Sequence, residues 1–165
     1  MTFKPREIPV IAMLTALTVA LSLVFIIPIP ATKGFVTLCE VGIYTTAILL
    51  KNPGGLAVGA LSGLLIDLLS GYPEWCLFSL MIHGTQGWLV GYLTSRKRHI
   101  SIGLALLGGS LVMIVGYLLA TTFLFGWGAG VASIIGNLFQ NGFGIAITIP
   151  LVASLHKVRP QLFNI

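Results

Sequence analysis

The chain has 165 residues, of which 56% are hydrophobic and only 8% are charged, and its mean hydropathy is +1.02. A water-soluble domain cannot present so apolar a surface to solvent, so the composition excludes that class and indicates an integral membrane protein. The net charge of +5 does not indicate a nucleic-acid partner, because the basic residues stand at the ends of apolar stretches, as in membrane proteins generally.

Six apolar stretches follow one another along the chain and predict six transmembrane helices in one bundle. They cover about 7–27, 37–50, 55–70, 75–94, 100–125 and 129–155. The second and third stretches are short for a bilayer core of about 30 Å and are followed or interrupted by glycine, a pattern that often borders a cavity. No connecting segment is long enough for a soluble domain, so we expect an all-α fold with a single membrane-embedded domain over residues 1–165.

The basic residues predict the orientation of this bundle. Six spans place both termini on the same side of the membrane, and nearly all Lys and Arg residues then fall on that side. Because basic loops stay in the cytoplasm, both termini are expected to be cytoplasmic. The residues on the terminal side are Lys4, Arg6, Lys51, Arg96, Lys97, Arg98, Lys157 and Arg159, and Lys33 falls on the other side.

Two of the predicted spans carry polar stripes. A spacing of i, i+4, i+7 in the fourth span and of i, i+3, i+4 in the sixth puts each set on one helix face. Depth can be counted inward from the outer end of each span at 1.5 Å per residue. His83 and Asn137 then lie about 12 Å deep, and the residues that follow them in each stripe lie about 16 to 17 Å deep. The stripes consist of Ser79, His83 and Gln86 in the fourth span and of Asn137, Gln140 and Asn141 in the sixth.

These stripes favour a pocket for a small polar solute, because polar groups are costly in lipid and mark a binding site by default. The alternative for each single residue is a hydrogen bond that joins packed helices. Tyr117 lies at a similar depth on the fifth span. Glu40 and Asp67, which are shallower, would contact a ligand, pair with Lys33 or cap a helix end. Phe35, on the first outer loop, is expected to close over an aromatic ligand.

Other aromatic residues at the outer ends of the spans, Tyr72, Trp75 and Trp127, fit an interfacial belt. Cys39 and Cys76 form no metal-binding pattern and are expected as two buried thiols, although the predicted topology also permits a disulfide.

The pattern argues against an enzyme and against a channel. No metal or cofactor site is expected, and Ala60-Leu61-Ser62-Gly63 lacks the first glycine of the Gly-x-Ser-Gly that a rhomboid-like protease needs. The inner half of the bundle is nearly free of polar groups, whereas a stand-alone carrier or channel acting as a homo-oligomer, the alternative function, would need a polar path across it.

Small residues predict close helix packing. Ala12, Ala16 and Ala20 recur every four residues on the first span, where another helix can approach closely. That helix belongs either to the same bundle or to a partner subunit, and the spacing leaves both open. Close packing inside the bundle is predicted at Gly54, Gly55, Gly59 and Gly63.

Several motifs resemble one known family over the whole chain. They are Gly34-Phe35-Val36-Thr37-Leu38, Asn52-Pro53-Gly54-Gly55, Asp67-x4-Gly71-Tyr72-Pro73, Phe78-Ser79-Leu80-Met81-Ile82-His83-Gly84 and Gly87-Trp88-Leu89-Val90-Gly91. With the length, the six spans and the alanine stripe, they resemble the substrate-binding S components of energy-coupling-factor (ECF) vitamin transporters. The resemblance is to the riboflavin-transporter-like branch, which includes pyridoxine and hydroxymethylpyrimidine binders.

The resemblance implies a subunit without its own ATPase, in the bacterial plasma membrane. Such a subunit captures a vitamin or vitamin precursor from outside, here pyridoxine or hydroxymethylpyrimidine. It works with a transmembrane coupling subunit, which would dock on the face of Ala12, Ala16 and Ala20, and with two cytoplasmic ABC ATPases. His83 stands where relatives often carry lysine.

Overall fold

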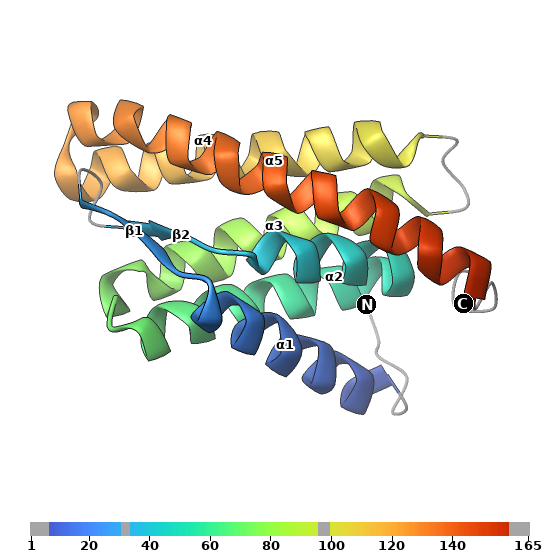
Figure 1. The fold of residues 1–165 in the computed structure, drawn as a ribbon. Helices are drawn as coiled ribbons and strands as arrows, with labels where there is room; N and C mark the ends of the chain where they lie inside the picture. Colours follow the sequence, from blue (N-terminus) through green and yellow to red (C-terminus); the bar gives the residue numbers. More distant parts are fainter. Residues whose placement is uncertain (1–6, 31–33, 96–99, 159–165) are drawn as a thin grey trace.

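The computed structural model describes residues 7–30, 34–95 and 100–158. Within these ranges the chain forms a bundle of five α-helices, with a two-stranded hairpin and a short 3₁₀ helix (Figure 1). The α-helices are α1 (Glu7–Val24), α2 (Cys39–Ser70), α3 (Cys76–Leu93), α4 (Ile102–Phe125) and α5 (Trp127–Val158). The hairpin consists of β1 (Ile27–Ile29) and β2 (Gly34–Val36), and the 3₁₀ helix η2 covers Pro73–Trp75.

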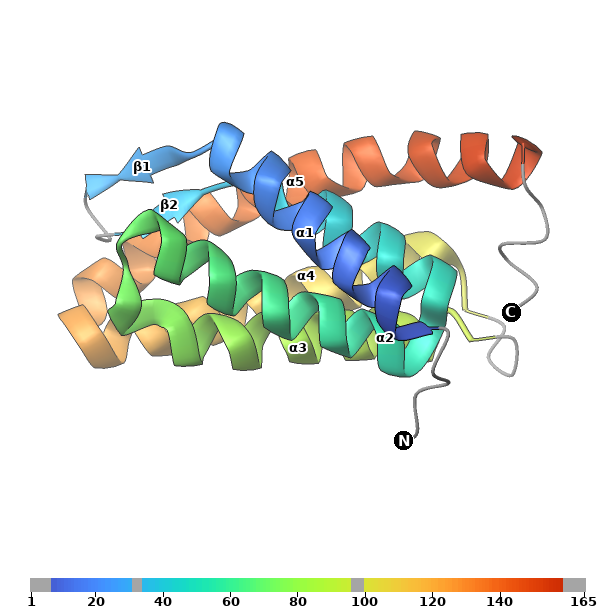
Figure 2. The ribbon, with the colours of Figure 1, turned by 90° about the horizontal axis from the view of Figure 1, so that it is seen from below.

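Helix α2 is divided in two by a reversal of the chain. Lys51 has a φ of 55° and Asn52 a ψ of 134°, and neither value is helical. Pro53 follows, and proline is tolerated in the first turn of a helix because the first N–H groups have no partner within the helix. Figures 1 and 2 show the chain doubling back there, so the two segments of α2 lie side by side. The turn predicted after the second apolar stretch is confirmed.

Four of the described helices are long and apolar enough to cross a membrane, namely α1, α2, α4 and α5. Helix α3 is not among the four, and it carries His83 and Gln86 within its 18 residues. The chain is therefore a membrane protein built of helices. Six crossings and two cytoplasmic termini stay predictions.

The loop after α1 contains a hairpin that the hydropathy pattern did not predict. Helix α1 ends at Val24, short of the expected residue 27, and β1 pairs with β2 in antiparallel register. Pro28 and Pro30 explain the end of the helix, because proline lacks the N–H group that a helix needs. The other predicted boundaries agree with the helix ends within three residues.

Glycines set a close contact between the second segment of α2 and α3. Three of them, spaced one turn apart, lie directly on the backbone of α3, so a side chain at any of the three would overlap it. The pairs are Gly55 with Gly87, Gly59 with His83 and Gly63 with Ser79. The predicted internal packing is confirmed for these three, and it fixes the height and orientation of the polar face of α3.

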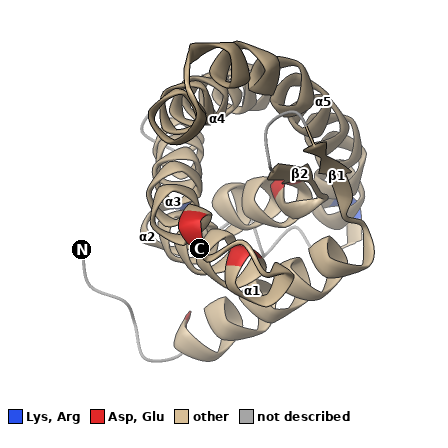
Figure 3. Cartoon of the chain, turned by 90° about the vertical axis from the view of Figure 1, so that its left-hand side faces the viewer, with Lys and Arg blue, Asp and Glu red and all other residues tan. Residues whose placement is uncertain are grey.

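The two ends of the bundle differ in charge. The start of α1 and the end of α5 lie at one end, opposite the hairpin (Figures 1 and 2). Figure 3 looks onto the hairpin end, and three of the four acidic residues, Glu40, Asp67 and Glu74, lie toward that end, whereas Glu7 begins α1 at the opposite end. The described basic residues, Lys51 and Lys157, lie at the opposite end of the bundle. The other basic residues from which the orientation was predicted lie outside the described residues. They are Lys4, Arg6, Lys33, Arg96, Lys97, Arg98 and Arg159.

Candidate functional site

A cavity lies beneath the hairpin, among α2, α3, α4 and α5. It brings together most of the residues that the sequence proposed for binding, although they come from five different elements. The predicted residues that line the cavity are Phe35, Asp67, Ser79, His83, Tyr117, Asn137 and Gln140. The other three, Glu40, Gln86 and Asn141, are buried but do not line it.

The size of this cavity limits what it can hold. It offers about 50 Å³ to the centres of water-sized molecules. By this measure one water needs about 10–15 Å³ and fills about 30 Å³ of liquid, so the cavity has room for roughly three to five waters, or roughly 100–150 Å³. A volume of this order is closer to that of one substituted aromatic ring than to that of three fused rings.

Aromatic side chains form part of the wall. Trp75 lines the cavity with only 4% of its surface exposed, and its ring centre lies 5.9 Å from that of Tyr117. At the rim, Phe35 packs edge-on against Tyr72 at 5.0 Å. The expectation of an interfacial belt is therefore wrong for Trp75, because the turn at η2 carries this residue inward. Trp127, 69% exposed, fits the belt.

The imidazole of His83 is held on both sides. The Gln86 amide nitrogen donates to the Tyr44 hydroxyl at 2.9 Å, so the Gln86 oxygen faces His83. His83 Nδ1 therefore donates to that oxygen, at 2.8 Å, and Nε2 pairs with the Tyr117 hydroxyl at 3.0 Å. The same hydroxyl lies 2.7 Å from Ser79 Oγ. His83 thus enters the cavity in a fixed orientation.

Behind this layer, polar side chains join helices to one another. Asn141 accepts hydrogen bonds from the Tyr44 hydroxyl and the Gln86 amide, and it donates to the Asn137 carbonyl at 2.8 Å. Tyr44 lies 2.9 Å from Ser110 Oγ. Gln86 and Asn141 therefore take the helix-joining role that the sequence left as the alternative. Direct contact of either residue with a ligand stays a prediction.

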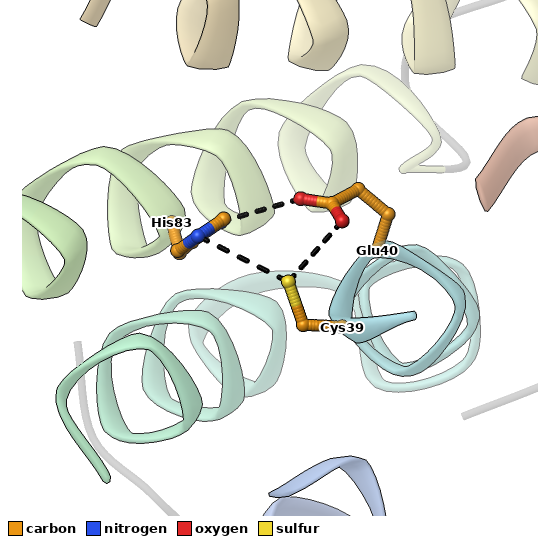
Figure 4. Close-up of side chains that lie close together, drawn as sticks. All are labelled: Cys39, Glu40 and His83. Atoms are coloured by element: carbon orange, nitrogen blue, oxygen red, sulfur yellow. Dashed lines mark hydrogen bonds and ion pairs between the residues drawn. The ribbon is translucent and has the colours of Figure 1, made fainter. Parts of the chain in front are cut away.

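Glu40 forms a cluster with Cys39 and His83, shown in Figure 4. The Cys39 thiol donates to Glu40 Oε2 at 3.2 Å, and Glu40 Oε1 lies 3.6 Å from His83 Nδ1. Sulfur, oxygen and nitrogen donors of this kind suit a metal such as zinc. Both nitrogens of His83 already have partners in Gln86 and Tyr117, so the three residues form a hydrogen-bonded cluster as they stand.

Gln140 ties the strand β2 to the helix α5. Its side-chain oxygen accepts a hydrogen bond from the Thr37 backbone N–H at 2.8 Å, and its nitrogen donates to the Cys39 sulfur at 3.4 Å. A side chain at Gly136, one turn earlier on α5, would overlap Ile29 of β1. The hairpin is therefore seated on α5 above the cavity.

The buried carboxylate of Asp67 has one oxygen without a hydrogen-bond partner in the described part of the chain, as does that of Glu40. Asp67 is 5% exposed and lines the cavity, and its Oδ2 atom has no hydrogen-bond partner among the described residues. The sequence left two other roles for Asp67, a helix cap and an ion pair with Lys33. The helix cap is made by the backbone carbonyl of Asp67, which accepts a hydrogen bond from Tyr72 N at 2.9 Å. Lys33 lies outside the described residues.

Sequence reasoning missed several residues of the site. Thr37, Cys39 and Trp75 line the cavity, and Tyr44 connects the polar side chains behind it. Tyr44 follows Glu40 by four residues and so shares its helix face, a signal that the hydropathy pattern of the short second stretch obscured. Cys39 and Cys76 are both free and buried, as expected for two thiols.

The alanine stripe of α1 faces away from the bundle. All three of its residues are exposed, whereas the opposite face of α1 is buried against the other helices. Packing inside the chain therefore does not account for the stripe. Its members are Ala12, Ala16 and Ala20, and the buried face consists of Ile11, Thr15, Thr18, Val19 and Ser22.

Comparison with known proteins gives a family and two relatives. Residues 2–157 match the family described as the ECF-type riboflavin transporter, S component. A protein of Lactococcus lactis subsp. cremoris (strain MG1363), described as the thiamine precursor transporter HmpT, is 35% identical over 136 residues, which are 82% of this chain and 78% of that protein. An uncharacterized protein of Pyrococcus woesei is 37% identical over 135 residues, which are 80% of this chain and 88% of that protein.

Proposed function

This chain belongs to the family of ECF-type riboflavin transporter S components, and we propose that it captures a hydroxymethylated aminopyrimidine, a precursor of thiamine, outside the cell. The single observation that supports this proposal most is the cavity beneath the hairpin, which has the size of one substituted ring. The cavity is closer in size to this ring than to the three fused rings of riboflavin. The similarity to a thiamine precursor transporter points to the same ligand class.

The lining of the cavity suits such a ring. Trp75 and Tyr117 offer aromatic surfaces, and Asn137, His83 and Asp67 offer groups that donate or accept hydrogen bonds. A pyrimidine with an amino and a hydroxymethyl group presents both an aromatic face and polar edges. Pyridoxine, the other ligand that the resemblance implies, has the same general shape. The relative from Lactococcus lactis is described as a thiamine precursor transporter, which favours the pyrimidine.

Transport would need partner subunits, because apolar side chains occupy the described interior of the bundle beyond the polar residues. An apolar cluster fills the end of the bundle opposite the hairpin and lies beyond the polar residues that surround Tyr44. Its members are Tyr44, Ala47, Ile48, Val90, Leu106 and Val152. We therefore propose that the chain works with a transmembrane coupling subunit and two ABC ATPases in a bacterial plasma membrane, with six crossings and both termini in the cytoplasm.

Binding without partners tests this function directly. The protein purified alone in detergent is expected to bind hydroxymethylpyrimidine with a submicromolar Kd, pyridoxine about tenfold or more weakly, and riboflavin not at all. Titration calorimetry measures all three, and quenching of tryptophan fluorescence gives a second readout because Trp75 lines the cavity. Absence of hydroxymethylpyrimidine binding, or tighter binding of riboflavin, would contradict the proposal.

Substitution of Gln140 by leucine is expected to weaken ligand binding about tenfold, because it leaves the buried Thr37 N–H without its acceptor and loosens the hairpin. Most of the effect should appear as faster dissociation, measured by stopped-flow fluorescence. Thr148→Val is the control, since Thr148 is a buried polar residue of the same helix that does not line the cavity. Equal effects of the two substitutions would remove the special role of Gln140.

A further inference from the structure

We infer that Asp67 selects the ligand by accepting a hydrogen bond from its exocyclic amino group, so that the cavity prefers amino-substituted rings over the same rings carrying a carbonyl group. This inference rests on the proposed function, since it assigns one group of the proposed ligand to one atom of the site. The atom is Asp67 Oδ2, which lines the cavity and has no hydrogen-bond partner among the described residues.

The position of Asp67 is fixed by the fold. Asp67 lies in the last turn of the second segment of α2, where its backbone carbonyl accepts the capping hydrogen bonds of Gly71 and Tyr72. The carboxyl group lies beside the Ser79 hydroxyl of α3, and the contact of Gly63 with the Ser79 backbone holds these two helices together. The backbone position of Asp67 is therefore set by the contact between α2 and α3, and its carboxylate is buried at the wall of the cavity.

An acceptor in this position calls for a donor. A buried polar atom without a partner destabilises a protein, and a charged one does so more strongly. Among the described residues two carboxylate oxygens are in this state, Asp67 Oδ2 and Glu40 Oε1, and of these two residues only Asp67 lines the cavity. An amino group on an aromatic ring donates two N–H groups and has little capacity to accept. A ring carbonyl in the same place would instead set two acceptors against each other.

The charges around the cavity support a ligand that is neutral or positive. Three acidic residues, Glu40, Asp67 and Glu74, lie at the hairpin end, whereas the basic residues in the described part of the chain lie at the other end. A phosphate ester of the ligand would be repelled by these carboxylates. We therefore expect the site to bind the free alcohol of an amino-substituted ring more tightly than its phosphate ester.

The test compares hydroxymethylpyrimidine with the analogue in which a carbonyl oxygen replaces the amino group. The wild-type protein is expected to bind the amino compound about 10 to 100 times more tightly than the carbonyl compound. Asp67→Asn introduces an N–H donor at the same place, so its affinity for the amino compound should fall about 10- to 100-fold and the preference should reverse. Calorimetry with both compounds, and with the phosphate ester of the first, gives the affinities.

Two variants separate recognition from other roles of the residue. Asp67→Glu keeps a carboxylate and should keep the preference for the amino compound. Glu74→Gln removes an exposed acid that does not line the cavity, and it should change neither affinity.

The outcomes distinguish this inference from the proposed function. If wild-type protein binds neither compound, the proposed function fails. If wild-type protein binds the amino compound and Asp67→Asn keeps the same preference, the function stands and the role of Asp67 is refuted. If Asp67→Asn loses both compounds, an unchanged preference in Asp67→Glu supports the inference, and loss of both compounds in Asp67→Glu as well refutes it in favour of a structural role.

Discussion

Substitution of Gly59 by leucine is expected to lower the free energy of unfolding by about 3 kcal/mol or more and to abolish ligand binding. Gly59 lies directly on the backbone carbonyl of His83, so a side chain there must push α2 and α3 apart. A backbone cannot turn aside as a flexible side chain can, which places this substitution among the severe cases of overpacking. Thermal unfolding in detergent should show a fall in Tm of about 6–12 °C, or the protein should fail to elute as a single species.

Gly142 provides the matched control for this experiment. It lies in α5, another long apolar helix, and a side chain there would meet nothing within 4 Å. Gly142→Leu therefore makes the same chemical change without an overlap, and its Tm and ligand affinity should stay close to those of the wild type. Similar losses in both variants would show that the added side chain, rather than the contact of α2 with α3, causes the effect.

Substitution of Ala16 by leucine is expected to stop uptake while leaving ligand binding intact. Ala16 stands in the middle of the exposed stripe of α1, where the proposed coupling subunit would approach closely. A leucine there adds bulk that an interface of small residues cannot hold, and uptake by the full complex should fall about tenfold or more. Uptake of labelled ligand by cells that express all subunits, compared with calorimetry on the purified chain, separates the two effects.

The control for Ala16 is Ala146→Leu, because Ala146 is also exposed on a lipid-facing helix but lies on α5, outside the stripe. It should leave both uptake and binding unchanged. Normal uptake by Ala16→Leu would refute the docking face, and loss of binding by this variant would show instead that α1 supports the cavity.

Much of the cavity could be predicted from the sequence because a helix repeats regularly. The spacing of Ser79 and His83 on one helix and of Asn137 and Gln140 on another put each pair on one face, and all four line the cavity. Periodicity does not show how deeply a face is covered. Gln86 and Asn141 continue the same stripes and yet lie behind the cavity, where they hydrogen-bond to Tyr44.

Other features depend on contacts between distant parts of the chain. The hairpin joins residues on both sides of a loop whose apolar strand β1 looks like the end of a transmembrane helix. Trp75 is amphipathic and fits an interface or a binding site equally well until the turn at η2 is known. Glu40 was expected at a shallow depth in its span, but the sequence did not show that its side chain is fully buried, where Gly144 of α5 leaves room for it.

The connection between α1 and the hairpin is short. Only Phe25 and Ile26 separate the end of α1 from the start of β1. A connection of two residues limits how far the end of α1 and the start of β1 can separate, so a large displacement of α1 would carry β1 with it. The helix with the outward alanine stripe is in this way tied to the cover of the cavity, so a partner that displaced α1 beyond the reach of this connection would also move that cover.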